Sequence, residues 1–546
     1  MIPGEAFSPC RTVSRVYSTG KDAMGVRGID RRQFIKSGLA LLAGSQWVGA
    51  SFGAAADPLN EPIATGPFKP DRHSLGQYRA PEWFRNAKFG MSAQWTPQSV
   101  PERGDWYARN MYIQGSAQYN YHVAHYGHPS KFGYKDICHR WKGERWDPEG
   151  LIDLYKKAGA KYFVALANHH DGFDCWDSSF QPWNSVNIGP NRDIVGTWAG
   201  IVRQCGLRFG LAVFSTPNWQ WFNVSHGSDK TGPLKGVLYD GNLTKVDGLG
   251  KWWDGYDPQM LYGPPHADGE PPSAEYFQNF FNRTKELIDR YRPDQVFFTD
   301  NGLPLGDTGL RLAAHFYNAS LLWHGKEIDV VINTKNVPPD LQNGLVWDRL
   351  PPEEIALFAW QMDICIGDWH YKRDITYRSA AEVVPYLVDV VSKNGNLLLN
   401  IPVKADGSID ERELSFLGQI TDWMKVNGEA IFDTRPWKVF GEGPTHAPAV
   451  DFPYVKVRYT AKDIRFTAKG ATLYAIALDW PSDGVLVIKS LARPSPYLDG
   501  EVASVLLLGS EARLKWTRNE GGLAITLPAG KVCDYAYSFK IRLQST

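Results

Sequence analysis

The stretch "AGAKYFVALANHHDGF", residues Ala158–Phe173, decides how the rest of this chain folds. Its centre, Tyr162–Ala167, is an unbroken apolar run, which is typical of a strand buried on both faces of a parallel sheet. The run ends abruptly in His169, His170 and Asp171. A buried strand that presents polar side chains at its end predicts a functional site there.

Other runs of the same kind precede and follow this strand, and the segments between them have helical periodicity. The clearest helix begins after Ser273, a suitable N-cap, and places aromatic and aliphatic side chains on one face. Six or more strand–helix repeats over about 350 residues predict an α/β fold, a (β/α)8-like barrel of the TIM type, with its active site at the carboxyl ends of the strands. The other predicted strands are Lys88–Trp95, Arg208–Ser215, Gln295–Gly302, Asp329–Thr334 and Gly395–Val403.

The pattern changes near the segment Asp433–Pro448. From Tyr454 onward, short apolar segments are separated by Gly, Pro and Asp, which predicts an antiparallel β-sandwich. We therefore expect a barrel over residues 57–432, a linker over 433–451 and a β-sandwich over 452–546.

The N-terminal region predicts export. Arg31-Arg32 precede Phe34 and Lys36, then come a moderately apolar stretch and the small residues Ala54–Ala56, as in twin-arginine signals. Residues 1–56 are thus expected to be a leader that directs the protein to the periplasm or outside a bacterial cell, with Met1 or Met24 as the start. No later apolar run reaches the ~20 residues that span a bilayer, so no membrane contact is expected after the leader is removed.

Composition favours a neutral partner. The chain has 59 basic and 59 acidic residues, which argues against nucleic acid or an anionic membrane as a ligand. It also has 21 Trp, 25 Tyr and 26 Phe, whose rings suit either a large core or a cleft that stacks on sugars.

The residues at the strand ends suit a polyhydroxylated substrate. They combine carboxylates, histidines and tryptophans, without cysteine ligands or a Gly-rich phosphate loop, so sugar hydrolysis is the leading chemistry. Each also has a structural interpretation: Asp300-Asn301-Gly302 is itself a turn signal, and His169-His170 could be core histidines. A metal pair on a strand would be spaced His-x-His, because adjacent residues point to opposite faces, so we expect no metal at these histidines.

Several motifs occur together in one order between about Pro81 and Pro481: "WFRNAKFGMSAQWTPQSVPERGDWYARNMY", "WDPEGLIDLYKKAGAKYFVALANHHDGF", "QVFFTDNG", "WQMDICIGDWHY", "SKNGNLLLNIPVKADGSI" and "DIRFTAKGATLYAIALDWP". With them the chain resembles the α-L-fucosidases of glycoside hydrolase family 29. The resemblance implies a barrel followed by a β-sandwich, and a retaining exo-glycosidase that removes terminal α-L-fucose from glycans without a cofactor. It leaves the glycosidic linkage and a homo-oligomeric state open.

The resemblance also implies roles for individual residues. Asp300 matches the nucleophile, and Asp348 is the first choice for the acid/base, with Glu353 and Glu354 as alternatives. His169 and His170 match the histidine pair that binds fucose hydroxyls. The remaining expected substrate-binding residues are Gln94, Asp105, Trp106, Phe214, Trp219, Lys335, Gln361 and Trp369.

Three of these residues depart from the family pattern. Gln94 stands where the family usually has His, Lys335 where Arg is common, and Gln361 where many members have Glu. The departures leave two alternatives open: a shifted sugar preference, such as an α-L-galactosidase, and a carbohydrate-binding member without catalysis.

Overall fold

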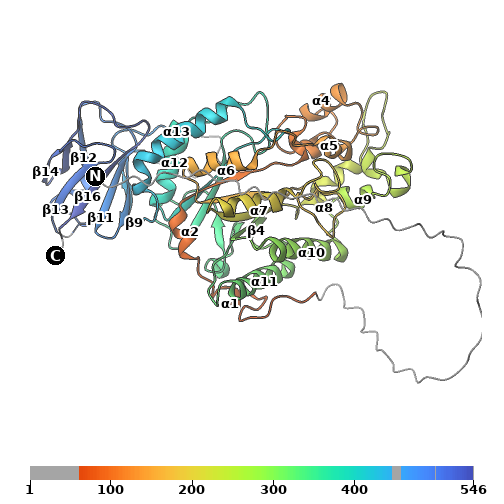
Figure 1. Ribbon diagram of the computed structural model, residues 1–546, viewed down its shortest axis with the longest axis horizontal. Helices are drawn as coiled ribbons and strands as arrows, with labels where there is room; N and C mark the ends of the chain where they lie inside the picture. The colour runs from red at the N-terminus through yellow and green to blue at the C-terminus, as the bar shows by residue number, and fades with distance from the viewer. Residues whose placement is uncertain (1–60, 446–456, 499, 545–546) are drawn as a thin grey trace, which may run out of the picture. The chain divides into compact units, whose positions relative to one another are not determined.

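The computed structural model describes residues 61–445, 457–498 and 500–544. Eight parallel strands form a closed barrel in sequential order, which confirms the predicted fold class. In Figure 1, helices such as α7, α10 and α11 lie around strand β4 of this barrel. The strands are β1 (Phe89–Ala93), β2 (Tyr162–Asn168), β3 (Arg208–Val213), β4 (Gln295–Asn301), β5 (Val331–Lys335), β6 (Val346–Asp348), β7 (Trp360–Cys365) and β8 (Gly395–Asn400).

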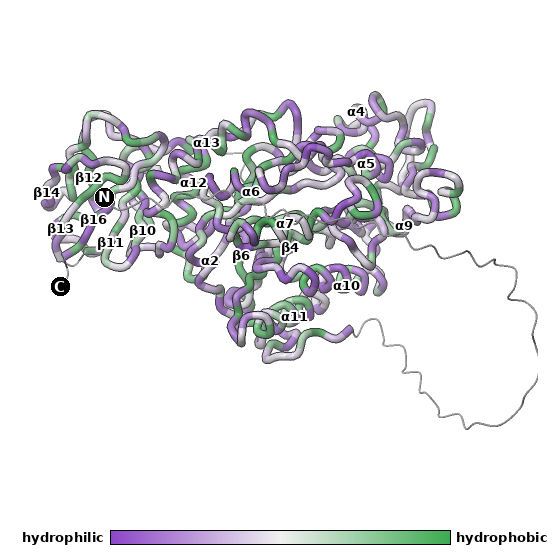
Figure 2. Tube along the Cα trace, viewed as in Figure 1, coloured by the Kyte–Doolittle hydropathy of each residue, from purple (hydrophilic) through white to green (hydrophobic). Residues whose placement is uncertain are grey.

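The apolar runs form the barrel because their side chains are buried on both faces. All seven residues of β2 are buried, and its alternate residues Tyr162, Val164 and Leu166 join a core cluster with Phe297 and Leu398. Hydrophobic residues concentrate along the strands, and hydrophilic residues mark the outer loops (Figure 2).

Helices surround the strands and cover their outer faces. α10 begins after Ser273, whose hydroxyl accepts a hydrogen bond from the Tyr276 N–H, as the sequence predicts. The α-helices are α1 (Arg72–Leu75), α2 (Glu82–Ala87), α3 (Tyr107–Asn110), α4 (Ala117–His125), α5 (Tyr134–Arg140), α6 (Pro148–Lys157), α7 (Ile194–Gln204), α8 (Asn218–Phe222), α9 (Pro258–Tyr262), α10 (Ala274–Tyr291), α11 (Asp307–Trp323), α12 (Ala380–Ser392) and α13 (Glu411–Asn427). Short 3-10 helices are η2 (Pro97–Ser99), η3 (Asn223–His226), η4 (Asp240–Asn242), η5 (Lys245–Gly248), η6 (Pro339–Leu341), η7 (Gly428–Ala430) and η8 (Lys489–Leu491).

The barrel is irregular around β6. Only the 3-10 helix η6 separates β5 from β6, and residues 349–359 between β6 and β7, all of them described, contain no helix. The sequence pattern did not predict β6 or β7. β6 has only three residues, and β7 carries the polar residues Gln361 and Asp363 among its apolar ones.

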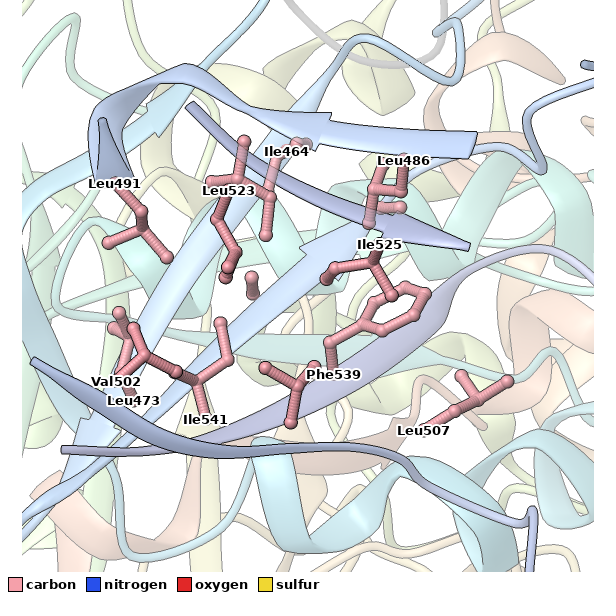
Figure 3. Packing of buried hydrophobic residues seen from close by; sticks show 14 of the residues in the cluster. Ile464, Leu473, Leu486, Leu491, Val502, Leu507, Leu523, Ile525, Phe539 and Ile541 are labelled. Atoms are coloured by element: carbon pink, nitrogen blue, oxygen red, sulfur yellow. The ribbon is translucent and has the colours of Figure 1, made fainter. Parts of the chain in front are cut away.

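The C-terminal region forms two antiparallel sheets with a shared core. Their order is β13-β16-β11-β10-β9 and β12-β15-β14, and Figure 3 shows residues of both, such as Ile525 and Phe539, meeting between them. The strands are β9 (Arg435–Glu442), β10 (Ile464–Lys469), β11 (Thr472–Ala477), β12 (Val485–Ile488), β13 (Val502–Leu507), β14 (Lys515–Asn519), β15 (Gly522–Thr526) and β16 (Tyr537–Leu543). β9 occupies much of the expected linker 433–451, because it pairs with β10 as an edge strand.

Helix α12 joins the barrel to this C-terminal region. It packs on β8 and also on β9 and β10. From within α12, Asp389 pairs with Arg465 of β10 at 2.5 Å and with Lys393 at 3.0 Å, and all three side chains are buried. The two regions therefore share a buried ionic contact as well as apolar surface.

The expected leader, residues 1–56, lies outside the described residues. Among those that are described, no helix combines the length and the apolar character needed to cross a bilayer.

Candidate active site

The polar residues predicted at the strand ends gather at one end of the barrel. His169 and His170 follow β2, Asp300 lies near the end of β4, and Lys335 and Asp348 end β5 and β6. Parallel strands in a closed barrel bring these ends to the same face, where TIM-type barrels carry their active sites.

The two histidines present opposite hydrogen-bonding groups. The Gln98 side-chain amide donates to His169 Nδ1 at 2.9 Å, so the N–H of the neutral ring lies on Nε2. His170 Nδ1 donates to the Phe214 carbonyl, which leaves its Nε2 as an acceptor. Burial lowers the pKa of both rings, and that of His169 falls well below its usual value because His170 and His370 also lie nearby. The pair therefore offers one donor and one acceptor to a ligand.

His370 holds the Asp105 side chain beside this pair. Its Nδ1 donates to Asp105 Oδ1 at 2.7 Å, and its Nε2 accepts from the Thr96 hydroxyl at 2.9 Å. The His370 ring meets the His169 ring edge-on at 5.1 Å. His370 belongs to the motif "WQMDICIGDWHY", from which no role was predicted for it, and this packing makes it the residue that positions Asp105.

Asp105, His169 and His370 are close enough for a metal ion, with one ligand atom of each within 4.8 Å of the others. However, both His370 nitrogens already bond to protein groups, and so does His169 Nδ1. A hydrogen-bonded network accounts for the cluster without an ion, and the expectation that no metal is needed stays a prediction.

Aromatic rings stand around the histidines. Trp106 is 44% exposed and meets His170 edge-on at 6.3 Å, and its backbone adopts a left-handed conformation (φ 61°) that is rare for a bulky residue. Trp221 meets His170 at 5.4 Å and Trp106 at 6.1 Å. The Phe214 ring lies 6.2 Å from that of His169. These apolar walls beside polar groups suit the two kinds of surface on a sugar.

Three carboxyl groups lie on β4, β6 and β7: Asp300, Asp348 and Asp363. Burial raises the pKa of Asp300 to about 6, and its Oδ2 has no hydrogen-bond partner among the described residues. Asp348 Oδ1 accepts a hydrogen bond from the Asp363 backbone N–H at 3.0 Å. Burial raises the pKa of Asp348 to about 6, and burial together with the Asp348 charge raises that of Asp363 well above its usual value. The charge of Lys335 opposes both rises.

Comparison with known proteins shows the family of the chain. The family model "Alpha-L-fucosidase" matches residues 57–429, about two thirds of the chain. The chain belongs to the α-L-fucosidase family. The model of the α-L-fucosidase C-terminal domain matches residues 455–542.

Individual α-L-fucosidases agree over most of their length. Rat tissue α-L-fucosidase is 29% identical over 502 residues, which cover 89% of this chain and 94% of the rat protein. Human tissue α-L-fucosidase is 28% identical, covering 87% and 91%. The structure of Thermotoga maritima α-fucosidase with a mechanism-based inhibitor is 26% identical with a TM-score of 0.65, covering 87% and 100%. The chain is therefore a glycoside hydrolase of the α-L-fucosidase class.

Within this α-L-fucosidase, most of the predicted site residues come together. Gln94, Phe214 and Asp363 line one small internal cavity of the barrel. Asp363 was not among the residues predicted for the site, although it lies two positions after the predicted Gln361, which is the spacing of residues on one face of a strand. Trp369 is half-buried beside His370, and its carbonyl accepts from the Asn400 amide at 3.0 Å.

Two predicted substrate contacts lie elsewhere. Gln361 is fully buried beside the first residues of β2 and β4. Its side-chain carbonyl accepts a hydrogen bond from the Tyr162 hydroxyl at 3.0 Å and another from the Gln295 side-chain amide at 3.1 Å. Trp219 stacks on His266 at 4.3 Å, and its indole N–H donates to the Glu270 carbonyl. Trp221, two residues later on α8, takes the predicted position beside the histidines instead.

The alternative acids differ from Asp348 in their surroundings. Glu353 and Glu354 are both exposed in the loop between β6 and β7, whereas Asp348 is 6% exposed. A buried carboxyl group retains its proton more readily than an exposed one. The geometry therefore favours Asp348, together with its neighbour Asp363, over the two glutamates.

Proposed function

We propose that this chain hydrolyses terminal α-L-fucosyl residues of glycans by a retaining, two-step mechanism with Asp300 as nucleophile. The observation that carries the proposal is the Asp300 carboxylate itself. It lies near the carboxyl end of β4, and its Oδ2 is buried without a hydrogen-bond partner among the described residues. A carboxylate oxygen without a close protein donor can attack an anomeric carbon.

The first step cleaves the glycosidic bond. A carboxylate oxygen of Asp300 bonds to the anomeric carbon while the bond from that carbon to the glycosidic oxygen breaks. Asp348 donates its proton to the departing oxygen, and the buried Asp363 beside it favours the protonated form of the pair.

The second step releases the sugar. Water attacks the same carbon, its proton passes to Asp348, and the ester bond to Asp300 breaks, which restores both carboxyl groups. Each step inverts the anomeric centre once, so L-fucose leaves with the α-configuration of the substrate.

The histidine pair accounts for recognition of the sugar. His169 Nε2–H donates to one hydroxyl and His170 Nε2 accepts from another, which suits neighbouring hydroxyls on a ring. Because both rings stay neutral, they bind the hydroxyls without attracting a charged ligand. Phe214 and Trp221 supply apolar surface against which a 6-deoxy methyl group gains from burial.

Covalent trapping tests the proposal. The wild-type enzyme should release 4-nitrophenol from its α-L-fucoside, and a 2-deoxy-2-fluoro-fucosyl donor should label the peptide that contains Asp300. Asp300→Gly should lose the label and several orders of magnitude in turnover. Labelling of another carboxylate, or unimpaired hydrolysis by Asp300→Gly, would overturn the assignment.

We also propose that the protein is exported through the twin-arginine pathway and processed near Ala56, on the strength of Arg31-Arg32, Phe34 and Lys36. Mass spectrometry of the protein from its source should then find an N-terminus near Asp57. Recovery of an intact Arg31-Arg32 segment in the mature cytoplasmic protein would contradict it.

A further inference from the structure

The short 3-10 helix η2, which follows β1, carries two polar side chains that reach the histidines of the site. Thr96 caps this helix, and its hydroxyl oxygen accepts a hydrogen bond from the Gln98 backbone N–H at 3.3 Å. Pro97 fixes the backbone dihedral angle φ at the first position of η2. Thr96 and Gln98 are both fully buried, so the direction of each side chain depends on its hydrogen bonds.

Two groups other than His169 orient the Gln98 amide. Its oxygen accepts from the Ala108 backbone N–H at 3.3 Å. Its nitrogen faces the Asp171 carboxyl group, whose charged form it stabilises by hydrogen bonding, as well as His169 Nδ1. The reversed amide would bring its N–H groups against the Ala108 N–H and its oxygen against the carboxylate, so both contacts would be repulsive. The donor of Gln98 therefore faces His169 for reasons that do not depend on the histidine itself.

Asp171 is held in place as an acceptor. Its Oδ2 accepts from the Tyr134 hydroxyl at 2.8 Å, and its Oδ1 accepts from the Phe173 N–H at 3.0 Å. Burial and the Asp171 charge raise the pKa of Tyr134 well above its usual value, so the phenol keeps its proton and donates it. Asp171 is fully buried, so it acts on His169 through Gln98 and not on a sugar directly.

His169 is left with one donor for a ligand. Because Nδ1 accepts from Gln98, the N–H of the neutral ring lies on Nε2. This Nε2 lies 3.7 Å from Asp105 Oδ1, beyond hydrogen-bond distance, and the same oxygen accepts from His370 Nδ1 at 2.7 Å. A ligand hydroxyl can therefore contact both groups, accepting from His169 Nε2–H and donating to Asp105.

The same short helix places the proton of His370. The Asp105 carboxylate can only accept, so His370 Nδ1 is the nitrogen that donates to it. His370 Nε2 then accepts from the Thr96 hydroxyl at 2.9 Å, while the oxygen of that hydroxyl accepts from the Gln98 N–H. Thus η2 supplies a donor to one nitrogen of each ring, and the N–H of the other nitrogen faces Asp105 or the ligand.

We propose that Gln98, oriented by Asp171 and Ala108, is a positioning residue that makes His169 a hydrogen-bond donor and so selects a sugar hydroxyl that accepts at this position. The proposal deepens the proposed function and rests on it, because the sugar must occupy the histidine site. A sugar with an ammonium or a methylene group at this position would leave the buried Nε2–H without an acceptor, which is costly.

The position of the proton can be tested without sugar. We would label the full-length enzyme with ¹⁵N-histidine and measure the ring nitrogen shifts at pH 7.5, assigning His169 from the signals that His169→Asn removes. In the wild type, Nδ1 should have the shift of an unprotonated nitrogen and Nε2 that of a protonated one. Gln98→Met has nearly the same shape and no donor, so the two shifts should move toward each other as the tautomers mix.

The matched control is Gln295→Met, which removes another fully buried amide, at the first residue of β4, and should keep the wild-type shifts of His169. A proton on Nδ1 in the wild type, or unchanged shifts in Gln98→Met, would overturn the proposal.

Sugar binding tests the consequence for recognition. Calorimetric titration of L-fucose into Asp300→Asn measures affinity without hydrolysis. Adding Gln98→Met should weaken binding about tenfold, the effect of one hydrogen bond between neutral groups, and adding Gln295→Met should not. Equal affinity with and without Gln98→Met would overturn the role in recognition. Expected ring shifts in a wild type that hydrolyses no fucoside would refute the proposed function while supporting the role of Gln98, so the two hypotheses fail separately.

Discussion

Replacing the proposed nucleophile should make the enzyme more stable as well as inactive. The pKa of Asp300 is raised to about 6 in the folded protein, against about 3.9 in an unfolded chain. The difference between these two pKa values is about 2, and each pKa unit corresponds to about 1.4 kcal/mol. Keeping the carboxylate charged in this buried position above pH 6 therefore costs about 3 kcal/mol. Asn has nearly the same shape and no charge, so Asp300→Asn should recover up to that amount.

The pH dependence of this gain identifies its cause. A raised carboxyl pKa means that the folded state holds the proton more tightly, so the stability contribution of Asp300 is complete below pH 4 and is lost as the pH rises to 6. The advantage of Asp300→Asn should therefore be about 3 kcal/mol at pH 7.5 and below about 0.5 kcal/mol at pH 4.

Urea unfolding followed by tryptophan fluorescence measures this difference at both pH values. Glu353→Gln, which neutralises an exposed carboxylate, serves as the control and should change stability by less than about 0.5 kcal/mol. If Asp300→Asn destabilises the protein, or stabilises it equally at pH 4 and pH 7.5, the carboxylate is not held at an electrostatic cost and the reasoning fails.

Three further predictions concern the acid/base, the pH profile and the C-terminal region. Asp348→Ala should lose activity on substrates with poor leaving groups, and added azide should restore turnover of an aryl fucoside and yield the α-fucosyl azide; rescue of Asp363→Ala or Glu353→Ala instead would reassign the acid. Below pH 6, kcat/KM should fall about tenfold per pH unit as Asp300 gains a proton. Lys335→Met should move the basic limb of the profile to higher pH, because the Lys335 charge lowers the pKa of the acid Asp348, whereas Lys335→Arg keeps that charge and should not move it. An acid limb near pH 4 would contradict the first part. Arg465→Ala should cost about 1.5–3 kcal/mol, because the buried Asp389 loses its charge-assisted hydrogen bond to Arg465 and keeps only Lys393; thermal unfolding would detect this, and a change below about 0.5 kcal/mol would contradict it.

The sequence predicted the long, apolar strands of the barrel because burial on both faces leaves a continuous signal. Strand β6 escaped because three residues, one of them Asp348, carry no periodicity. Strand β7 escaped because its inward positions are occupied by Gln361 and Asp363, so its pattern does not resemble a buried strand. The polar residues on these two strands, which include the proposed acid Asp348, hide the strands from an analysis of hydrophobicity.

The sequence predicted which types of residue gather near the site, but not how deep in the barrel each side chain lies. Gln361 and Asp363 share one strand face, yet only the pairing with neighbouring strands places Gln361 beside Tyr162 and Asp363 beside Asp348. Likewise, Trp219 and Trp221 lie two positions apart on a short helix, so their rings point in different directions. A motif match fixes the neighbourhood of such residues, whereas the direction of each side chain depends on how the helix packs.

Helix α12 has a consequence for how this protein can be divided. Ten of its thirteen residues are buried, including consecutive ones such as Val383–Pro385 and Leu387–Ser392, so it lacks the solvent-facing stripe of an ordinary barrel helix. The C-terminal sheets cover the side that would otherwise face water. An isolated barrel cut near residue 433 would expose the valines of α12 and leave Asp389 with Lys393 but without Arg465, and should aggregate. The C-terminal region is thus a wall of the catalytic domain, and neither part is a module that can be exchanged alone.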